Sequence, residues 1–150
     1  MDVFDLLKED HAKLKILFQD LEDTPEREAL TREHLFTHLK TELTLHAECE
    51  DAYLYPILAG SIPTQALVLE SNVAHKLAKA LLGELDAEPK DALAWSAKLK
   101  VLREIVMLHV RQEEWELFPK ARLLISAEDA EAIAIDMEAY KAEAMLLQMG

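Results

Sequence analysis

Two segments of this 150-residue chain repeat the same pattern without gaps. Residues 45–56 read LHAECEDAYLYP, and residues 108–119 read LHVRQEEWELFP. Each copy holds Leu-His, three residues, Glu, an acid, two residues, Leu, an aromatic residue and Pro. Another histidine precedes each copy at nearly the same distance, because His11 lies 35 residues before His46 and His75 lies 34 before His109. The chain is therefore predicted to consist of two helical hairpins of one design.

The rest of the sequence favours helix. Ala, Leu, Glu and Lys dominate, whereas three glycines and five prolines leave little material for hairpin turns. The predicted helices cover about residues 3–22, 25–52, 62–85, 89–117 and 127–147, with Thr24 expected to cap the second and Ser126 the fifth. We expect one all-α domain over residues 1–150: an antiparallel up-down four-helix bundle (about 1–120) with an additional C-terminal helix (about 127–147). The last helix packs outside the bundle or supports a homodimer.

Charge and composition exclude several classes of protein. A net charge of −13 argues against a nucleic-acid partner and against an anionic membrane surface. No apolar run approaches the roughly 18–20 residues that span a bilayer. One cysteine, Cys49, allows no internal disulfide, and the first residues do not resemble a signal peptide. The expected location is the cytoplasm.

The repeated motif predicts a metal site. Residues four apart lie on the same face of a helix. The side chains of His46 and Glu50 therefore point in the same direction, as do those of His109 and Glu113. Leucine, isoleucine and valine precede them on these faces, and burying two carboxylates without cations costs on the order of several kcal/mol. A dimetal centre removes that cost, since each glutamate can bridge two ions while histidines cap them. The candidate ligands are His11, His46, Glu50, His75, His109 and Glu113.

The donor set also restricts the metal. Four imidazoles and two carboxylates without a thiolate are unlike structural zinc sites built on cysteine, and they suit iron, manganese or cobalt. They are too few for two complete octahedra, which leaves positions for water, oxo or hydroxo bridges, and small molecules. Ferritin-like diiron bundles use Glu-x-x-His. Here the positions three before the later histidines hold Leu43, Asn72 and Val106, which excludes that pattern.

These motifs resemble the hemerythrin family, in particular the bacterial hemerythrin-like (HHE cation-binding) domains, over roughly residues 1–120. The matching elements are Asp10-His11, His46-x-x-x-Glu50, His75, His109-x-x-x-Glu113 and the two Leu-aromatic-Pro endings. The resemblance implies a non-haem diiron centre in a four-helix bundle, with two iron ions bridged by oxo or hydroxo groups; manganese fits the same donors. It implies that the four histidines are terminal ligands and that Glu50 and Glu113 are bridging carboxylates.

Two departures from respiratory hemerythrins bear on function. Those proteins carry a second histidine one turn after the helix-three ligand, where this chain has Lys79, and an aspartate five residues after the last histidine, where it has Glu113 at four. The more open site favours binding of, or reaction with, dioxygen, peroxide or nitric oxide in sensing or stress protection. As an enzyme it would be a peroxide- or oxygen-reactive diiron oxidoreductase. The alternatives are iron handling or delivery, including iron–sulfur cluster repair, and a structural bundle with vestigial ligands.

The sequence also suggests roles for several residues near the candidate ligands. Tyr53, seven residues after His46, is a candidate hydrogen-bond partner of the ligands or else a core aromatic. Lys79 lines the open side of the metals or extends to solvent. Cys49 is expected to be a small, buried or partly exposed thiol, with a redox role as the alternative, and Trp115 is expected to be a packing residue. The remaining acids beside the two glutamates are expected to be solvated, as are His34 and His38.

Overall fold

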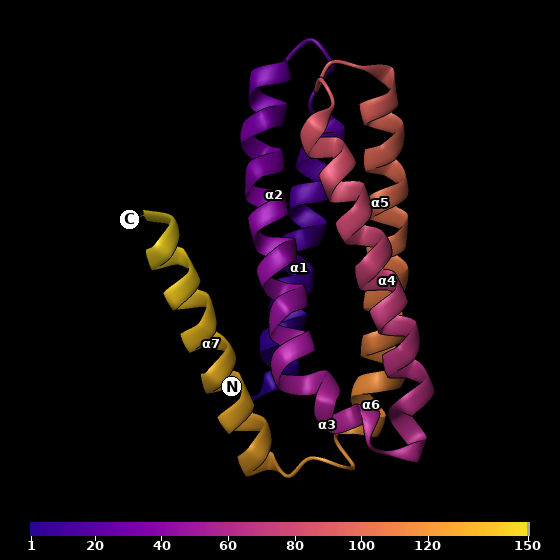
Figure 1. Ribbon diagram of the computed structural model, residues 1–150, viewed down its shortest axis with the longest axis vertical. Coiled ribbons are helices and arrows are strands. Elements are labelled where there is room, and N and C mark those ends of the chain that lie inside the picture. Colours follow the sequence, from indigo (N-terminus) through magenta and orange to yellow (C-terminus); the bar gives the residue numbers. More distant parts are fainter. Residues whose placement is uncertain (150) are drawn as a thin grey trace.

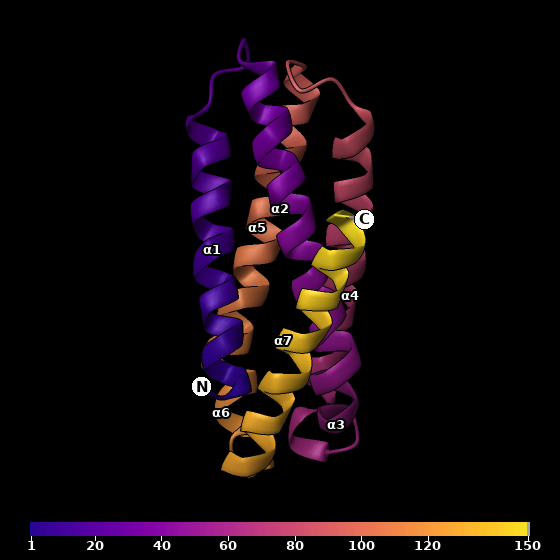
Figure 2. The same cartoon turned by 90° about the vertical axis from the view of Figure 1, so that its left-hand side faces the viewer.

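The computed structural model describes residues 1–149, and within them it contains helices and no strands. Four long helices lie side by side and alternate in direction (Figures 1 and 2). They are α1 (Val3–Asp23), α2 (Ala29–Cys49), α4 (Ile62–Ala87) and α5 (Leu93–Gln112). A further helix, α7 (Ala127–Met149), lies along the outside of the bundle. The predicted antiparallel four-helix bundle with an additional C-terminal helix is confirmed.

Both α2 and α5 end in a single π-helical turn. These turns, η1 (Glu50–Leu54) and η2 (Glu113–Leu117), lead into the short helices α3 (Tyr55–Ala59) and α6 (Phe118–Ala121). Pro56 and Pro119 cannot donate the next α-helical hydrogen bond, and the N–H groups of Tyr55 and Phe118 bond instead to carbonyls five residues back. The repeat therefore encodes a wider turn that changes the face on which the following residues lie.

The apolar core forms two clusters. One surrounds Phe18, Phe36 and Trp95 and involves all four long helices. The other joins the start of α1 to the two π turns and to α7, whose Ile133 and Met137 are buried there. The predicted ligands lie between these clusters, so the bundle holds its polar groups at one level. Helix α7 thus packs outside the four helices, as expected.

One predicted cap is wrong and another is confirmed. Thr24 ends α1 instead of starting α2, because its N–H bonds to the Leu21 carbonyl and its hydroxyl donates to the Asp20 carbonyl. Helix α2 begins only at Ala29, without a side-chain cap. Ser126 accepts the N–H of Asp129 at 3.1 Å and starts α7. None of the described helices is long and apolar enough to cross a membrane.

Candidate metal centre

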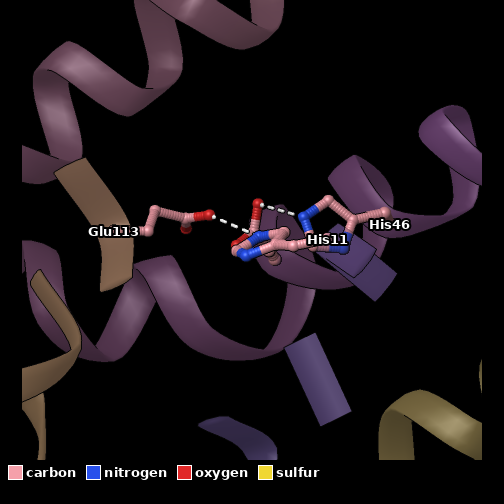
Figure 3. Close-up of side chains that lie close together, drawn as sticks. His11, His46 and Glu113 are labelled. Carbon is pink, nitrogen blue, oxygen red and sulfur yellow. Dashed lines mark ion pairs between the residues drawn. The ribbon is translucent and has the colours of Figure 1, made fainter. Parts of the chain in front are cut away.

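The structure brings all six predicted ligand residues together inside the bundle. One histidine comes from each long helix, and each glutamate is the first residue of a π turn. Their donor atoms form two groups that share Glu50, and within each group the atoms lie within 4.8 Å of one another. The first group contains His11, His46, Glu50 and Glu113; the second contains Glu50, His75 and His109. Figure 3 shows His11, His46 and Glu113 converging from different helices.

Each buried glutamate lies against imidazoles from more than one helix. Glu113 Oε1 is 3.2 Å from Nε2 of both His11 and His109. Glu50 Oε1 is 3.3 Å from His46 Nε2 and 3.1 Å from His75 Nε2. Both carboxylates are completely shielded from solvent. The arrangement places two anionic groups and four nitrogen donors around one space.

Several of these donor atoms lie close to one another but make no hydrogen bond of acceptable geometry with any described residue. They are His11 Nε2, His46 Nε2, Glu50 Oε2 and Glu113 Oε1. An unsatisfied buried polar atom costs free energy, and such atoms are rare in folded proteins. Cations would satisfy them all, and the mixed imidazole and carboxylate set suits iron or manganese. The residues present therefore fit a metal centre, although their individual roles as ligands stay a prediction.

The charges of the site depend on one another. Burial lowers the pKa of His46, but the charge of Glu50 and the bond to Asp10 outweigh it and raise that pKa to about 10. Burial likewise opposes the charged form of His109, and Glu113 raises its pKa to about 10. Burial acts to raise the pKa of Glu50, yet the neighbouring His46 holds it well below its usual range. Protons on the imidazoles thus balance the carboxylates when no metal is bound, and metal ions would displace them.

Acidic residues orient three of the histidines through Nδ1. His11 Nδ1 lies 2.7 Å from Glu114 Oε2, and His75 Nδ1 lies 3.0 Å from Asp51 Oδ1. The acidic runs are expected to be mostly solvated, and the side chain of Asp51 is indeed 50% exposed, whereas that of Glu114 is 29% exposed. Each follows its glutamate in the repeat and reaches a histidine of the other hairpin. The second acid in both copies was the signal that sequence reasoning missed.

A buried aspartate supports the remaining histidine of the first hairpin. Asp10 accepts a hydrogen bond from His46 Nδ1 at 2.9 Å and is only 4% exposed. Lys141 of α7 also contacts Asp10. Partners of this kind fix the tautomer and direction of a ligand imidazole.

Tyr55, and not Tyr53, contacts the centre. The Tyr55 hydroxyl donates to Glu113 Oε2 at 2.7 Å and lies 3.1 Å from Glu50 Oε1. Burial and the two glutamates raise its pKa well above the ordinary value, so it stays protonated. Tyr53 packs instead against Tyr140, with ring centroids 6.0 Å apart. The prediction for Tyr53 assumed a continuous α-helix, whereas the π turn brings Tyr55 round to the site.

Of the predictions for the remaining residues, some are confirmed and one is wrong. Cys49 is fully buried, and burial raises the pKa of its thiol to about 11, which fits an inert cysteine. His34 and His38 are exposed, as expected. Trp115 is 79% exposed, so the prediction that it packs is wrong. Lys79 lines a cavity beside the centre while remaining exposed.

The fold and the donor set define a helical-bundle protein of the hemerythrin class. The chain belongs to the hemerythrin HHE cation binding domain family, whose model matches residues 2–121. An HHE cation-binding domain-containing protein from Mycobacterium kansasii has the same fold, with a TM-score of 0.81 and 23% identity, over 97% of this chain and 91% of that chain. A protein named DNA nickase from Nostoc sp. (strain PCC 7120) is 33% identical over 146 residues, which is 95% of this chain and 40% of that protein.

Proposed function

We propose that this chain holds two iron ions and that the centre binds or reduces a small oxidant: dioxygen, peroxide or nitric oxide. Iron, when bound, supplies electrons and open coordination positions for such molecules. The observation that carries the proposal is the convergence of six donors on a space that opens to a cavity. His46, His75 and His109 line that cavity on the side of the centre. A purely structural site would be closed by protein ligands.

The chain's own residues suit a reactive site. The Tyr55 hydroxyl holds a proton 2.7 Å from Glu113 Oε2, in a position to stabilise negative charge that develops beside the carboxylates. Leu43 and Val106 line the approach and reduce its access to water. Lys79 lies on that approach as a cation where respiratory hemerythrins have an imidazole. These features favour reaction with an entering molecule over simple carriage of dioxygen.

The test is iron loading followed by exposure to each oxidant. The chain is loaded anaerobically with ferrous iron, and metal analysis is expected to give two irons per chain. Dioxygen, peroxide and nitric oxide are then added separately, and the near-ultraviolet absorption is expected to change with each ligand that reacts. A Glu50→Ala variant should lose iron, whereas His38→Ala, which alters an exposed histidine of α2, should not. Failure to retain iron, or a spectrum unmoved by all three oxidants, would refute the proposal.

Iron delivery is the competing function, and the side chain of His75 is the observation that favours it. That side chain is 12% exposed beside the cavity, more than those of the other predicted ligand histidines, and it offers a route for exchange. If the chain delivers iron, it should release iron to a chelator or to an apo-cluster protein at least as fast as the centre reacts with an oxidant. Slow release combined with a fast response to oxidant supports the redox function instead.

A further inference from the structure

A cavity of about 560 Å³ opens between α2 and α4 beside the candidate metal centre. It extends along α4 from His75 past Lys79 to Gly83. One water molecule takes roughly 30 Å³ of liquid, so dioxygen or peroxide would fill a small part of this space. Pockets of roughly 300–1,000 Å³ are the size that holds small organic molecules. The cavity is larger than the proposed oxidants require.

Because the chain contains an internal repeat, the interface that contains the cavity can be compared with an equivalent interface elsewhere in the bundle. When the two hairpins are aligned by their histidines, the interface between α2 and α4 corresponds to that between α5 and α1. An equivalent ion pair bridges each interface: Lys40 with Asp86 at 2.9 Å in the first, and Arg103 with Glu22 in the second. The two interfaces therefore share a frame, and differences in packing between them arise from side chains.

At three positions a smaller side chain lines the cavity than occupies the matching position of the other hairpin, whereas Lys76 and Leu43 are larger than their counterparts Ala12 and Val106. In each of three aligned pairs the cavity residue comes from α2 or α4, and its counterpart from α1 or α5 is larger. The pairs, with the α2 or α4 residue first, are Ala78 and Leu14, Thr44 and Met107, and Ala47 and Val110; Leu14 and Val110 also reach the cavity. Space that the second set of side chains would fill is left open at the α2–α4 interface.

A glycine within α4 is a further cavity position that holds a smaller residue than its counterpart in the other hairpin. Gly83 aligns with Gln19, and a Cβ atom built at Gly83 would meet nothing within 4 Å. Glycine in a helix interior is less stable than alanine. Gly83 is exposed and lines the cavity, so a larger side chain there would meet no clash at Cβ.

The inner wall of the cavity is apolar. Leu14, Leu43, Leu82 and Val106 form it, and all four are buried. The centre's imidazoles lie at one end, where His109 Nδ1 has no hydrogen-bond partner among residues 1–149. An occupant would therefore need an apolar body of several carbon atoms.

The charges at the mouth favour an anion. Lys76 and Lys79 line it, are exposed, and make no ion pair with any described residue. Two acids also line it, but both are engaged: Glu48 accepts from the Tyr140 hydroxyl and Asp51 from His75 Nδ1. Glu48 keeps its negative charge because the tyrosine hydroxyl is neutral, so the mouth holds two ammonium groups and one carboxylate that make no ion pair with a described residue.

We propose that this cavity binds a small amphipathic organic anion, with its apolar body against the leucines and its carboxylate at Lys79 and Lys76. The ligand would lie next to the candidate metal centre but would be held by this chain's own side chains. The inference goes beyond the proposed reaction with small oxidants, and it adds an organic ligand to the chemistry of the site.

The first experiment tests the class of ligand. Decanoate, 1-decanol and decyltrimethylammonium are titrated below their micelle-forming concentrations into the iron-loaded chain, and calorimetry measures binding. Decanoate is expected to bind once per chain, with the cation about tenfold weaker or more. Lys79→Glu should weaken decanoate by a similar factor, while Lys120→Glu, an exposed lysine of α6, should not. No saturable binding, or equal binding of anion and cation, would overturn the inference.

The second experiment tests the location. Ala78→Phe fills the interior, and Gly83→Leu fills the open position on α4 without a clash at Cβ. Ala78→Phe should abolish decanoate binding and Gly83→Leu should weaken it, whereas Leu77→Phe, at a half-exposed position of α4, should leave it unchanged. Circular dichroism melting identifies any variant that fails to fold. Binding like that of the unaltered chain in a folded cavity variant would refute the site.

Iron analysis of the same preparations separates this inference from the proposed function. A chain that holds two irons and responds to oxidants but ignores decanoate contradicts only the organic-anion site. A chain that binds decanoate in this cavity but retains no iron contradicts only the diiron proposal.

Discussion

The two hairpins present equivalent donors to the centre but stabilise them differently. Each places an aromatic ring from its Leu-aromatic-Pro ending against a histidine of the other hairpin. Tyr55 stacks on His75 with centroids 5.3 Å apart, and Phe118 stacks on His11 at 6.1 Å. Only the first ring has a hydroxyl, and it donates to Glu113. The duplicated backbone thus sets where the rings lie, whereas one oxygen atom makes the centre asymmetric.

The two hairpins also differ in the hydrogen-bond partners that they give to the Nδ1 atoms of His46 and His109. His46 donates to Asp10, which Lys141 also contacts. The residue that aligns with Asp10 is Ala74, and the matching nitrogen, Nδ1 of His109, has no partner among the residues described. The first hairpin therefore orients His46 through a carboxylate, while the second leaves the equivalent nitrogen of His109 without a partner among the described residues. The comparison shows an asymmetry in how His46 and His109 are oriented.

The largest expected effect distinguishes the two glutamates. Glu50 belongs to both groups of donor atoms, and Glu113 to one. Glu50→Ala is therefore expected to lose both irons, whereas Glu113→Ala retains part of the metal. Metal analysis checks the stoichiometry, with Glu116→Ala as an exposed control in the same acidic run. Equal iron content in the two ligand variants would show that the hairpins contribute equally.

The pH dependence of the metal-free chain tests what the hairpins share. His46 and His109, one from each, have a pKa of about 10 in the folded chain against an ordinary value of 6.5. Because the folded values are raised, this stabilisation is fully present below about pH 6.5 and is lost as pH rises through about 10. Chemical denaturation at several pH values should show the free energy of unfolding falling over that window. The iron-loaded chain should show a smaller fall, and a metal-free stability that rises would contradict the assignment.

Exchanging the two aromatic residues tests the asymmetry directly. Tyr55→Phe removes a hydrogen bond to a buried carboxylate and should lower the free energy of unfolding of the metal-free chain by about 1.5–3 kcal/mol. Phe118→Tyr buries a hydroxyl at a position that is 1% exposed and should also destabilise, by about 1–3 kcal/mol. Urea denaturation with a chelator measures both. No change in Tyr55→Phe would mean that the hydroxyl contributes nothing to the centre.

Removing the carboxylate behind His46 should weaken metal binding without abolishing it. Asp10→Asn leaves a weaker acceptor for His46 Nδ1, and loss of such a partner costs roughly 10–100-fold in metal affinity. Iron affinity is measured by competition with a chelator. Ala74→Asp, which offers His109 the partner that it lacks, should raise the affinity. An opposite order of the two variants would refute the comparison between the hairpins.

The convergence of the six candidate ligands was predictable because the information is local and repeated. A His-x-x-x-Glu spacing fixes a shared helix face, and two copies predict two hairpins. The role of Tyr55 was not predictable, since the periodicity of an α-helix does not include the π turn that redirects it. The predicted helix cap at Thr24 is wrong for a related reason. The threonine hydroxyl can bond backward to a carbonyl of α1 as well as forward to the next helix. The cavity depends on side chains from four helices, which no single stretch of sequence records.

The smallest expected effect comes from α7, which packs outside the duplicated bundle and touches the support of His46 through the contact of Lys141 with Asp10. Burial acts to raise the pKa of Asp10, and His46 together with Lys141 outweighs it and lowers that pKa. Lys141→Met removes one of the two cations while His46 still donates, so iron affinity should fall by less than in Asp10→Asn. Chelator competition measures the difference, with Lys120→Met as the control. A loss as large as that of Asp10→Asn would mean that α7, and not the hairpin itself, fixes His46.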